Sequence, residues 1–178
     1  MQHMARQPDH IPLTPGTRLP FRGEEHELVW PEGRGRTRLR TGDAPGIESP
    51  GDLLTFPDRI RSFLKREAKA DLTEAVNRHA ERLGVVPDKI SLRDTTSRWG
   101  SCSSRRTLSF SWRLILAPPE ILDYVAAHEV AHLLQMNHSK AFWSLVEESY
   151  GPHTHARDWL HTHGQRLHSF GRGGLAGG

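Results

Sequence analysis

The feature that most constrains this chain is His128-Glu129-Val130-Ala131-His132, an H-E-x-x-H motif inside an otherwise apolar stretch. Residues 121–136 contain neither Gly nor Pro, and their aliphatic side chains cover most of a helical circumference, which predicts a buried helix. Buried helices exclude ionisable side chains unless these are paired, hydrogen-bonded or bound to a metal. The motif therefore predicts a chemical role for its polar residues.

The spacing of the two histidines indicates which role. Residues four apart on a helix lie one above the other, so His128 and His132 project toward a common point. Two neutral imidazoles in this arrangement can bind Zn²⁺, with Glu129 on the adjacent stripe acting on a metal-bound water. The motif thus predicts a site for one zinc ion with a catalytic glutamate beside it.

A catalytic zinc site needs a third protein ligand and one open coordination position. His138 follows six residues after the motif, and Ser139 is typical of the N-cap of a new helix, which we expect over residues 140–150. A turn before that helix would fold His138 back toward the first two histidines. Glu147 and Glu148 are the competing third ligands, and the residues alone leave the choice open.

Length and composition exclude several classes of protein. The chain of 178 residues is long enough for one well-buried domain, and its formal charge of +3 is too small for a dedicated nucleic-acid binder. The single cysteine, Cys102, excludes an internal disulfide and fits a reducing compartment. Residues 1–17 lack the apolar core of a signal peptide, and no apolar run could span a membrane. We therefore expect a cytoplasmic protein, monomeric by default and without a membrane partner.

The distribution of Gly, Pro and periodic segments predicts four regions along the chain. They are a disordered arm over residues 1–16, an N-terminal β extension over 17–56, a catalytic domain over 57–170 and a disordered tail over 171–178.

Within the β extension, alternating segments predict a small antiparallel meander. Strands are expected at residues 17–22, 25–30 and 36–40, a loop at 41–49, and a fourth strand at 51–56.

The catalytic domain is expected to begin with a long amphipathic helix over residues 58–83, capped by Asp58 and ended by Gly84. Three strands and a last helix are expected at residues 89–94, 98–102, 107–117 and 155–170. The predicted fold class is α+β, with a small mixed or antiparallel sheet packed against the long helix and the H-E-x-x-H helix.

Short motifs accompany the histidines along the second half of the chain. They are Ser97-Arg98-Trp99-Gly100-Ser101-Cys102, Trp112-Arg113-Leu114, Ala117-Pro118-Pro119-Glu120, Leu122-Asp123-Tyr124-Val125, Asn137-His138-Ser139, Phe142-Trp143, Trp159-Leu160 and His163-Gly164. Together with His128-Glu129, this set resembles the YgjP-like zinc metallopeptidases, whose relatives are the WLM and SprT-like proteases.

The resemblance implies a zincin-like fold with metal ligands at His128, His132 and His138, and a catalytic glutamate at Glu129. It implies a zinc-dependent metallopeptidase that hydrolyses peptide bonds through a zinc-bound water activated by Glu129. The expected partner is a peptide or protein substrate. The residues that bind this substrate are not implied.

Two alternative functions stay open beside this one. One is a metal-dependent hydrolase of another amide. The other is a DNA-associated protease or DNA-binding module related to SprT-like proteins, because residues 93–113 hold five arginines and one acidic residue. The arginines are Arg93, Arg98, Arg105, Arg106 and Arg113, and the acid is Asp94.

Further residues have two interpretations. Arg98 or Tyr150 is a candidate donor to the oxyanion of the reaction, and residues 107–116 are a candidate edge strand for an extended substrate. Cys102 is interpreted as a small buried residue rather than an inhibitory zinc ligand. The tryptophans are interpreted as core residues, and the five histidines after Gly151 as a solvated helix face or loop.

Overall fold

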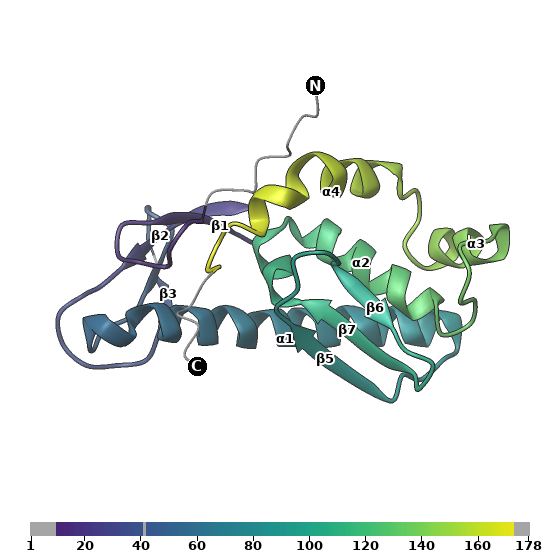
Figure 1. Ribbon diagram of the computed structural model, residues 1–178, viewed down its shortest axis with the longest axis horizontal. Coiled ribbons are helices and arrows are strands. Elements are labelled where there is room, and N and C mark those ends of the chain that lie inside the picture. Colours follow the sequence, from purple (N-terminus) through teal and green to yellow (C-terminus); the bar gives the residue numbers. More distant parts are fainter. Residues whose placement is uncertain (1–9, 41, 173–178) are drawn as a thin grey trace, which may run out of the picture.

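A long helix, α1 (Phe56–Leu83), runs most of the length of the molecule and connects its two halves (Figure 1). The structure is a computed structural model that describes residues 10–40 and 42–172. A four-stranded sheet lies near the start of α1, and a three-stranded sheet and three further helices lie farther along it. This arrangement confirms the predicted α+β class.

The sheet near the start of α1 is mixed rather than a meander. Its strands are β1 (Arg18–Phe21), β2 (Glu24–Val29), β3 (Arg38–Arg40) and β4 (Gly46–Glu48). The strand order is β1-β2-β4-β3, with a parallel β2–β4 pair and two antiparallel pairs. Leu28 and Ile47 are opposite each other across the parallel pair, and both are fully buried. The predicted antiparallel meander is therefore wrong, because burial of Ile47 places β4 inside the sheet.

The fourth strand also lies earlier in the chain than predicted. It falls within residues 41–49, which were expected to be a loop, whereas the expected strand at 51–56 contains a 3₁₀ turn, η1 (Leu53–Thr55). The Asp52 carboxylate accepts a hydrogen bond from the Leu54 N–H at 2.9 Å and so starts this turn. Leu54 is 88% exposed, so the apolar residues here do not mark a buried strand.

Helix α1 ends where the sequence predicts and begins slightly earlier. Gly84 adopts φ +68°, and its N–H bonds to carbonyls of the last turn, which is the left-handed cap that glycine favours. The helix starts at Phe56 with Thr55 at the N-cap, so Asp58 lies in the first turn instead of capping it. One face of α1 packs into the core through residues that include Ile60, Leu64, Leu72 and Val76.

The second sheet is short and mixed. Its strands are β5 (Lys89–Arg93), β6 (Gly100–Cys102) and β7 (Thr107–Ser111), in the order β5-β7-β6. The predicted strand over residues 107–117 stops at Ser111, because the Ser111 hydroxyl accepts a hydrogen bond from the Arg113 N–H and starts a 3₁₀ turn, η2 (Trp112–Leu116). All five residues of η2 are buried, and the turn packs against α1.

Three helices complete the second half. They are α2 (Pro119–Ala131), α3 (Lys140–Ser149) and α4 (Thr154–Leu167). Helix α2 is buried over most of its circumference, as its apolar sequence predicts, but it is shorter than the apolar stretch. His132 is its C-cap, and beyond it Leu134 and Met136 are exposed. Among the described helices, none is both long and apolar enough to cross a membrane.

The described part of the predicted N-terminal arm is packed against the rest of the chain. Ile11 forms a parallel bridge with Phe170, its carbonyl accepts a hydrogen bond from the Gly171 N–H at 2.9 Å, and Leu13 is only 2% exposed. Residues 10–16, expected as part of a disordered arm, therefore contact the core through the buried Leu13 and the partly buried Ile11. Residues 1–9 and 173–178 lie outside the described part of the chain.

A buried polar contact connects α1, α2 and α3. His79 is fully buried, and its Nε2 donates a hydrogen bond to the Asp123 carboxylate at 2.8 Å. The Ser149 hydroxyl contacts the other ring nitrogen of His79. Arg78 also pairs with Asp123, but from the exposed surface. Since burial of an unpaired polar group is costly, this contact fixes the three helices relative to one another.

Replacement of His79 by Leu removes the partner of two polar side chains. We expect the free energy of unfolding to fall by roughly 1–3 kcal/mol, because the Ser149 hydroxyl is left buried without its partner. Urea denaturation measures this change. Arg78→Gln removes the exposed partner of Asp123 and is the control, with an expected loss of at most about 1 kcal/mol. Equal losses in both variants would contradict the structural role of His79.

The lowered pKa of His168, the C-cap of α4, makes the stability of the fold depend on pH. His168 is 7% exposed and stacks on Trp99, and burial, helped by the nearby charges of Arg113 and Arg172, lowers its pKa to about 4. In the unfolded chain the pKa of this histidine is near 6.5. Between pH 6.5 and pH 4 the unfolded state therefore binds more protons than the folded state. The contribution to stability is complete above pH 6.5 and is lost as the pH falls toward 4.

Unfolding curves of the metal-free wild type and the His168→Gln variant, measured from pH 7 to pH 4, test this dependence. We expect the stability difference between the two proteins to shrink as the pH falls, because only the wild type loses this contribution. Other buried histidines contribute equally to both curves. A constant difference across the range would show that His168 does not titrate in this way.

Candidate metal centre

Two histidines project from the C-terminal end of α2. His128 lies in the last turn of the helix and His132 is its C-cap, so the four-residue spacing places them on one stripe. Their ring centroids are 5.0 Å apart. The buried remainder of α2 fixes this end of the helix against the core, and the two rings are therefore held in place by the backbone that carries them.

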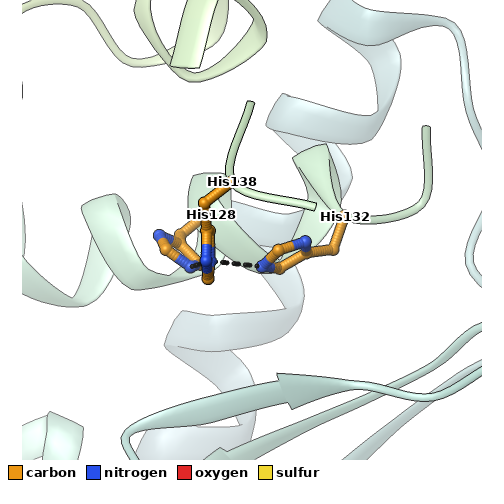
Figure 2. A group of neighbouring side chains, drawn as sticks. All are labelled: His128, His132 and His138. Carbon is orange, nitrogen blue, oxygen red and sulfur yellow. Dashed lines mark hydrogen bonds between the residues drawn. The ribbon is translucent and has the colours of Figure 1, made fainter. Parts of the chain in front are cut away.

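The turn before α3 brings a third histidine to the same point. The Ser139 hydroxyl accepts a hydrogen bond from the Phe142 N–H and caps α3, as predicted. This turn places the Nε2 atom of His138 at 3.1 Å from that of His132 and 3.3 Å from that of His128 (Figure 2). The three imidazoles thus converge through equivalent nitrogen atoms.

The separations of these nitrogen atoms fit a single bound ion. Two nitrogen atoms that each lie about 2.0–2.1 Å from a tetrahedral zinc ion are about 3.3–3.4 Å apart. The Nδ1 atom of His132 lies 3.0 Å from the Gln135 carbonyl and donates its proton there, which leaves a lone pair on Nε2. The donor set therefore fits a metal ion that prefers nitrogen ligands.

Burial keeps two of the rings in the form that binds metals. It lowers the pKa of His128 to about 3, with further lowering by His132 and His138, and it also lowers the pKa of His132. Both rings are therefore neutral at neutral pH. Tyr124 lies four residues before His128. Its hydroxyl is 3.3 Å from the Nδ1 atom of that histidine, the ring nitrogen that does not face His138.

The Glu129 side chain extends from α2 toward β6 of the second sheet. It is 5% exposed, and burial raises its pKa to about 8, an effect that the positive charge of Arg98 opposes. A Cβ atom on Gly100 would lie 2.8 Å from both Cγ and Oε2 of Glu129. The carboxylate can therefore occupy this position only because residue 100 of β6 is a glycine.

The histidines and Glu129 line one cavity of about 310 Å³. All three residues of β6 form part of its wall, and β6 is an edge strand with β7 on one side only. The predicted edge strand over residues 107–116 is therefore wrong, because β7 lies in the middle of the sheet. The lining residues are Arg98, Gly100, Ser101, Cys102, His128, Glu129, His132, Met136 and His138.

The other candidate site residues are placed as follows. Glu147 and Glu148 are exposed on α3 and do not belong to the histidine cluster. Tyr150 donates its hydroxyl to the Glu120 carbonyl at 3.0 Å and does not line the cavity, whereas Arg98 does. Cys102 lines the cavity at the end of β6, and burial, together with the charge of Glu129, raises the pKa of its thiol.

The basic segment over residues 93–113 is divided by the fold. Arg113 is 1% exposed, pairs with Asp94 and donates a hydrogen bond to the Phe170 carbonyl at 2.8 Å. Arg106 donates to the Val86 carbonyl at 2.8 Å. The five arginines therefore do not form one continuous surface, and Arg113 contributes to the core.

Aromatic and histidine residues near the site are mostly structural. Trp112 is fully buried, and Trp143 stacks between His138 and His153 behind the cluster. In the described part of the chain, the histidines after Gly151 form no second cluster of metal-binding size. These are His153, His155, His161, His163 and His168.

Three contributors to the site had no role assigned from the sequence, although Tyr124 and Gly100 lie within the motifs of the family resemblance. Tyr124 lies on the same helical stripe as His128, four residues away, so its spacing was an available signal. Gly100 and Met136 had no such signal, because their importance depends on how β6 and the turn after α2 pack around Glu129 and the histidines.

Comparisons with known proteins give a family match for this chain. The family model of the YgjP-like metallopeptidase domain matches residues 1–163. Among solved structures, the chain is similar to the metallopeptidase zymogen abylysin of Pyrococcus abyssi, with 22% identity and a TM-score of 0.49 over 53% of this chain and 96% of that one. The search of curated proteins finds no significant match.

Metal binding distinguishes His138 from the competing carboxylates. We expect the metal-free wild type to bind one Zn²⁺ per chain in a competition titration with a chelator. His138→Ala removes one of the three converging nitrogen atoms. Loss of a hydrogen-bonding partner of a metal ligand typically weakens metal binding roughly 10–100-fold, and loss of the ligand itself should weaken it by more. A Glu147→Gln/Glu148→Gln variant is the matched control and should bind like the wild type. The opposite result would assign the third ligand to α3.

Proposed function

The chain belongs to the YgjP-like metallopeptidase family, and from this premise we propose that it is a zinc-dependent peptidase with a zincin-like catalytic domain. The observation that supports this most directly is the convergence of three imidazole nitrogens in a cavity that a buried glutamate also lines. Three nitrogen ligands leave a fourth position of a tetrahedral ion for water or substrate, which is the composition of a catalytic rather than a structural site.

In this proposal His128, His132 and His138 hold the ion. When bound, Zn²⁺ supplies a Lewis acid that lowers the pKa of water and polarises a carbonyl group. The surrounding residues orient its ligands: the Gln135 carbonyl fixes the tautomer of His132, and the Tyr124 hydroxyl contacts the far side of the His128 ring. The first contact leaves the Nε2 lone pair of His132 free for the ion, and the second holds the His128 ring in place.

Glu129 is proposed to move the proton of the reaction. Its carboxylate lines the same cavity as the histidines and is held against the backbone of Gly100. Burial raises its pKa, so its ionised form is a stronger base toward the attacking water than the carboxylate of an exposed glutamate. The protonated carboxyl group can then donate to the leaving amine, as a general acid.

The substrate is proposed to bind along β6. This strand lines the cavity and has one unpaired edge, so an extended peptide can add to it through main-chain hydrogen bonds. Arg98 lies two residues before the strand and lines the cavity. Its guanidinium is the candidate donor to the oxygen on which negative charge develops during attack on the peptide carbonyl.

The Glu129→Gln variant tests the proposed function. It should bind zinc like the wild type, because the three histidines are intact, and its turnover should fall by about 10²–10⁴-fold with loss of the proton acceptor. Digestion of a mixed peptide library by the zinc-loaded proteins measures turnover, and metal analysis measures zinc content. Glu148→Gln, the same change on the exposed face of α3, is the control. Full activity of Glu129→Gln would exclude the proposed mechanism.

A further inference from the structure

A second cavity, of about 430 Å³, lies at the other end of α1 from the metal centre. It is formed by the segment before β3 and the first turns of α1, near the four-stranded sheet and distant from α3 (Figure 1). The lining residues are Gly35, Arg36, Thr37, Thr55, Asp58, Arg59, Ser62 and Arg66. None of these residues takes part in the proposed peptidase function.

The guanidinium of Arg59 is oriented by neutral oxygen atoms. Its Nε donates to the Ser49 hydroxyl at 2.8 Å, and its Nη1 donates to the Asp52 carbonyl at 2.8 Å and to the Thr55 hydroxyl at 2.6 Å. Ser49 is itself fully buried. These contacts fix the side chain without neutralising its charge, so an ordered positive charge borders the cavity.

Two further arginines add positive charge to the same cavity wall. Arg59, Ser62 and Arg66 follow one another at spacings of three and four residues, which places them on one face of α1. Among the described residues, neither Arg36 nor Arg66 has an ion-pair or hydrogen-bond partner. The acid in the lining, Asp58, pairs with Arg61 at 3.2 Å. The wall therefore carries an excess of positive charge.

Arginines elsewhere on this sheet are arranged differently. Arg18 pairs with Glu25, and Arg38 and Arg40 both pair with Glu48. The strand arginines are thus matched by acids, while the three arginines around the cavity are not. This contrast indicates that the cavity, and not the sheet surface in general, is suited to an anion.

We propose that this cavity binds the phosphate group of a small phosphorylated molecule. A phosphate carries up to two charges and several acceptor oxygens, so it can use the guanidinium groups of Arg36 and Arg66, the positive charge of Arg59 and the Ser62 hydroxyl. A single carboxylate has too few oxygens and too little charge to engage all of them. The volume lies within the range of small-molecule sites and leaves room for an organic group beside the phosphate.

Calorimetric titrations of the full chain with inorganic phosphate, phenyl phosphate and citrate test the proposal. We expect saturable binding of the two phosphates, tighter than that of citrate. The relative affinity of phenyl phosphate and inorganic phosphate distinguishes a phosphate ester from the free ion as the source of the bound group. The titrations are repeated with metal-free protein, because phosphate also binds zinc. Absence of saturable phosphate binding, or tighter binding of citrate, overturns the proposal.

Substitutions assign the binding to this cavity. Arg36→Gln/Arg66→Gln should weaken phosphate binding at least about tenfold, because two charge-assisted hydrogen bonds are lost. Both side chains are exposed, so the fold should be retained, which circular dichroism verifies. Arg105→Gln, an exposed arginine in the loop between β6 and β7, is the matched control and should bind phosphate like the wild type. Equal affinities in both variants would exclude the cavity as the site.

Discussion

The candidate metal centre depends on a chain reversal directly after a buried helix. The last turn and C-cap of α2 hold His128 and His132, but two ligands do not complete a site. The short connection to α3 supplies the third, because the Ser139 cap starts the new helix one residue after His138. Helix α2 packs against α1, and the contact of His79 with Asp123 and Ser149 fixes α2 and α3 relative to each other.

The two cavities control charge in opposite ways. At the metal centre, burial disfavours ionisation: it lowers the pKa of His128 and raises that of Glu129. At the other cavity, neutral oxygens rather than a carboxylate orient the Arg59 guanidinium, and Arg36 and Arg66 are exposed to solvent. One chain thus presents neutral imidazole nitrogens at one end of α1 and, within the described part of the chain, unpaired guanidinium groups at the other.

The parts of the fold that depend on local pattern were predictable from the sequence. The apolar circumference of α2, the Gly84 end of α1 and the Ser139 cap each follow from a few neighbouring residues. The insertion of β4 between β2 and β3 was not predictable, since it depends on the contact between Leu28 and Ile47, nineteen positions apart. The end of β7 at Ser111 likewise depends on burial of η2 against α1.

The same distinction applies to the candidate site. The positions of His128, Glu129 and His132 follow from helical spacing, and that of His138 from the expected turn. The edge position of β6 and the approach of Gly100 to Glu129 belong to sheet topology and to packing between distant elements. Neither can be inferred from neighbouring residues in the sequence. For this reason the segment of β7, and not β6, was expected at the edge of the sheet.

The composition of β6 has a consequence for motion near the cavity. Its three residues, Gly100, Ser101 and Cys102, have small side chains, and glycine and serine stabilise strands poorly. Because it pairs with β7 alone, we expect this strand to open at lower free-energy cost than the buried helix α2 beside it. If the substrate binds along β6 as proposed, such opening would let the cavity accept peptide backbones of differing shape without displacement of the histidines on α2.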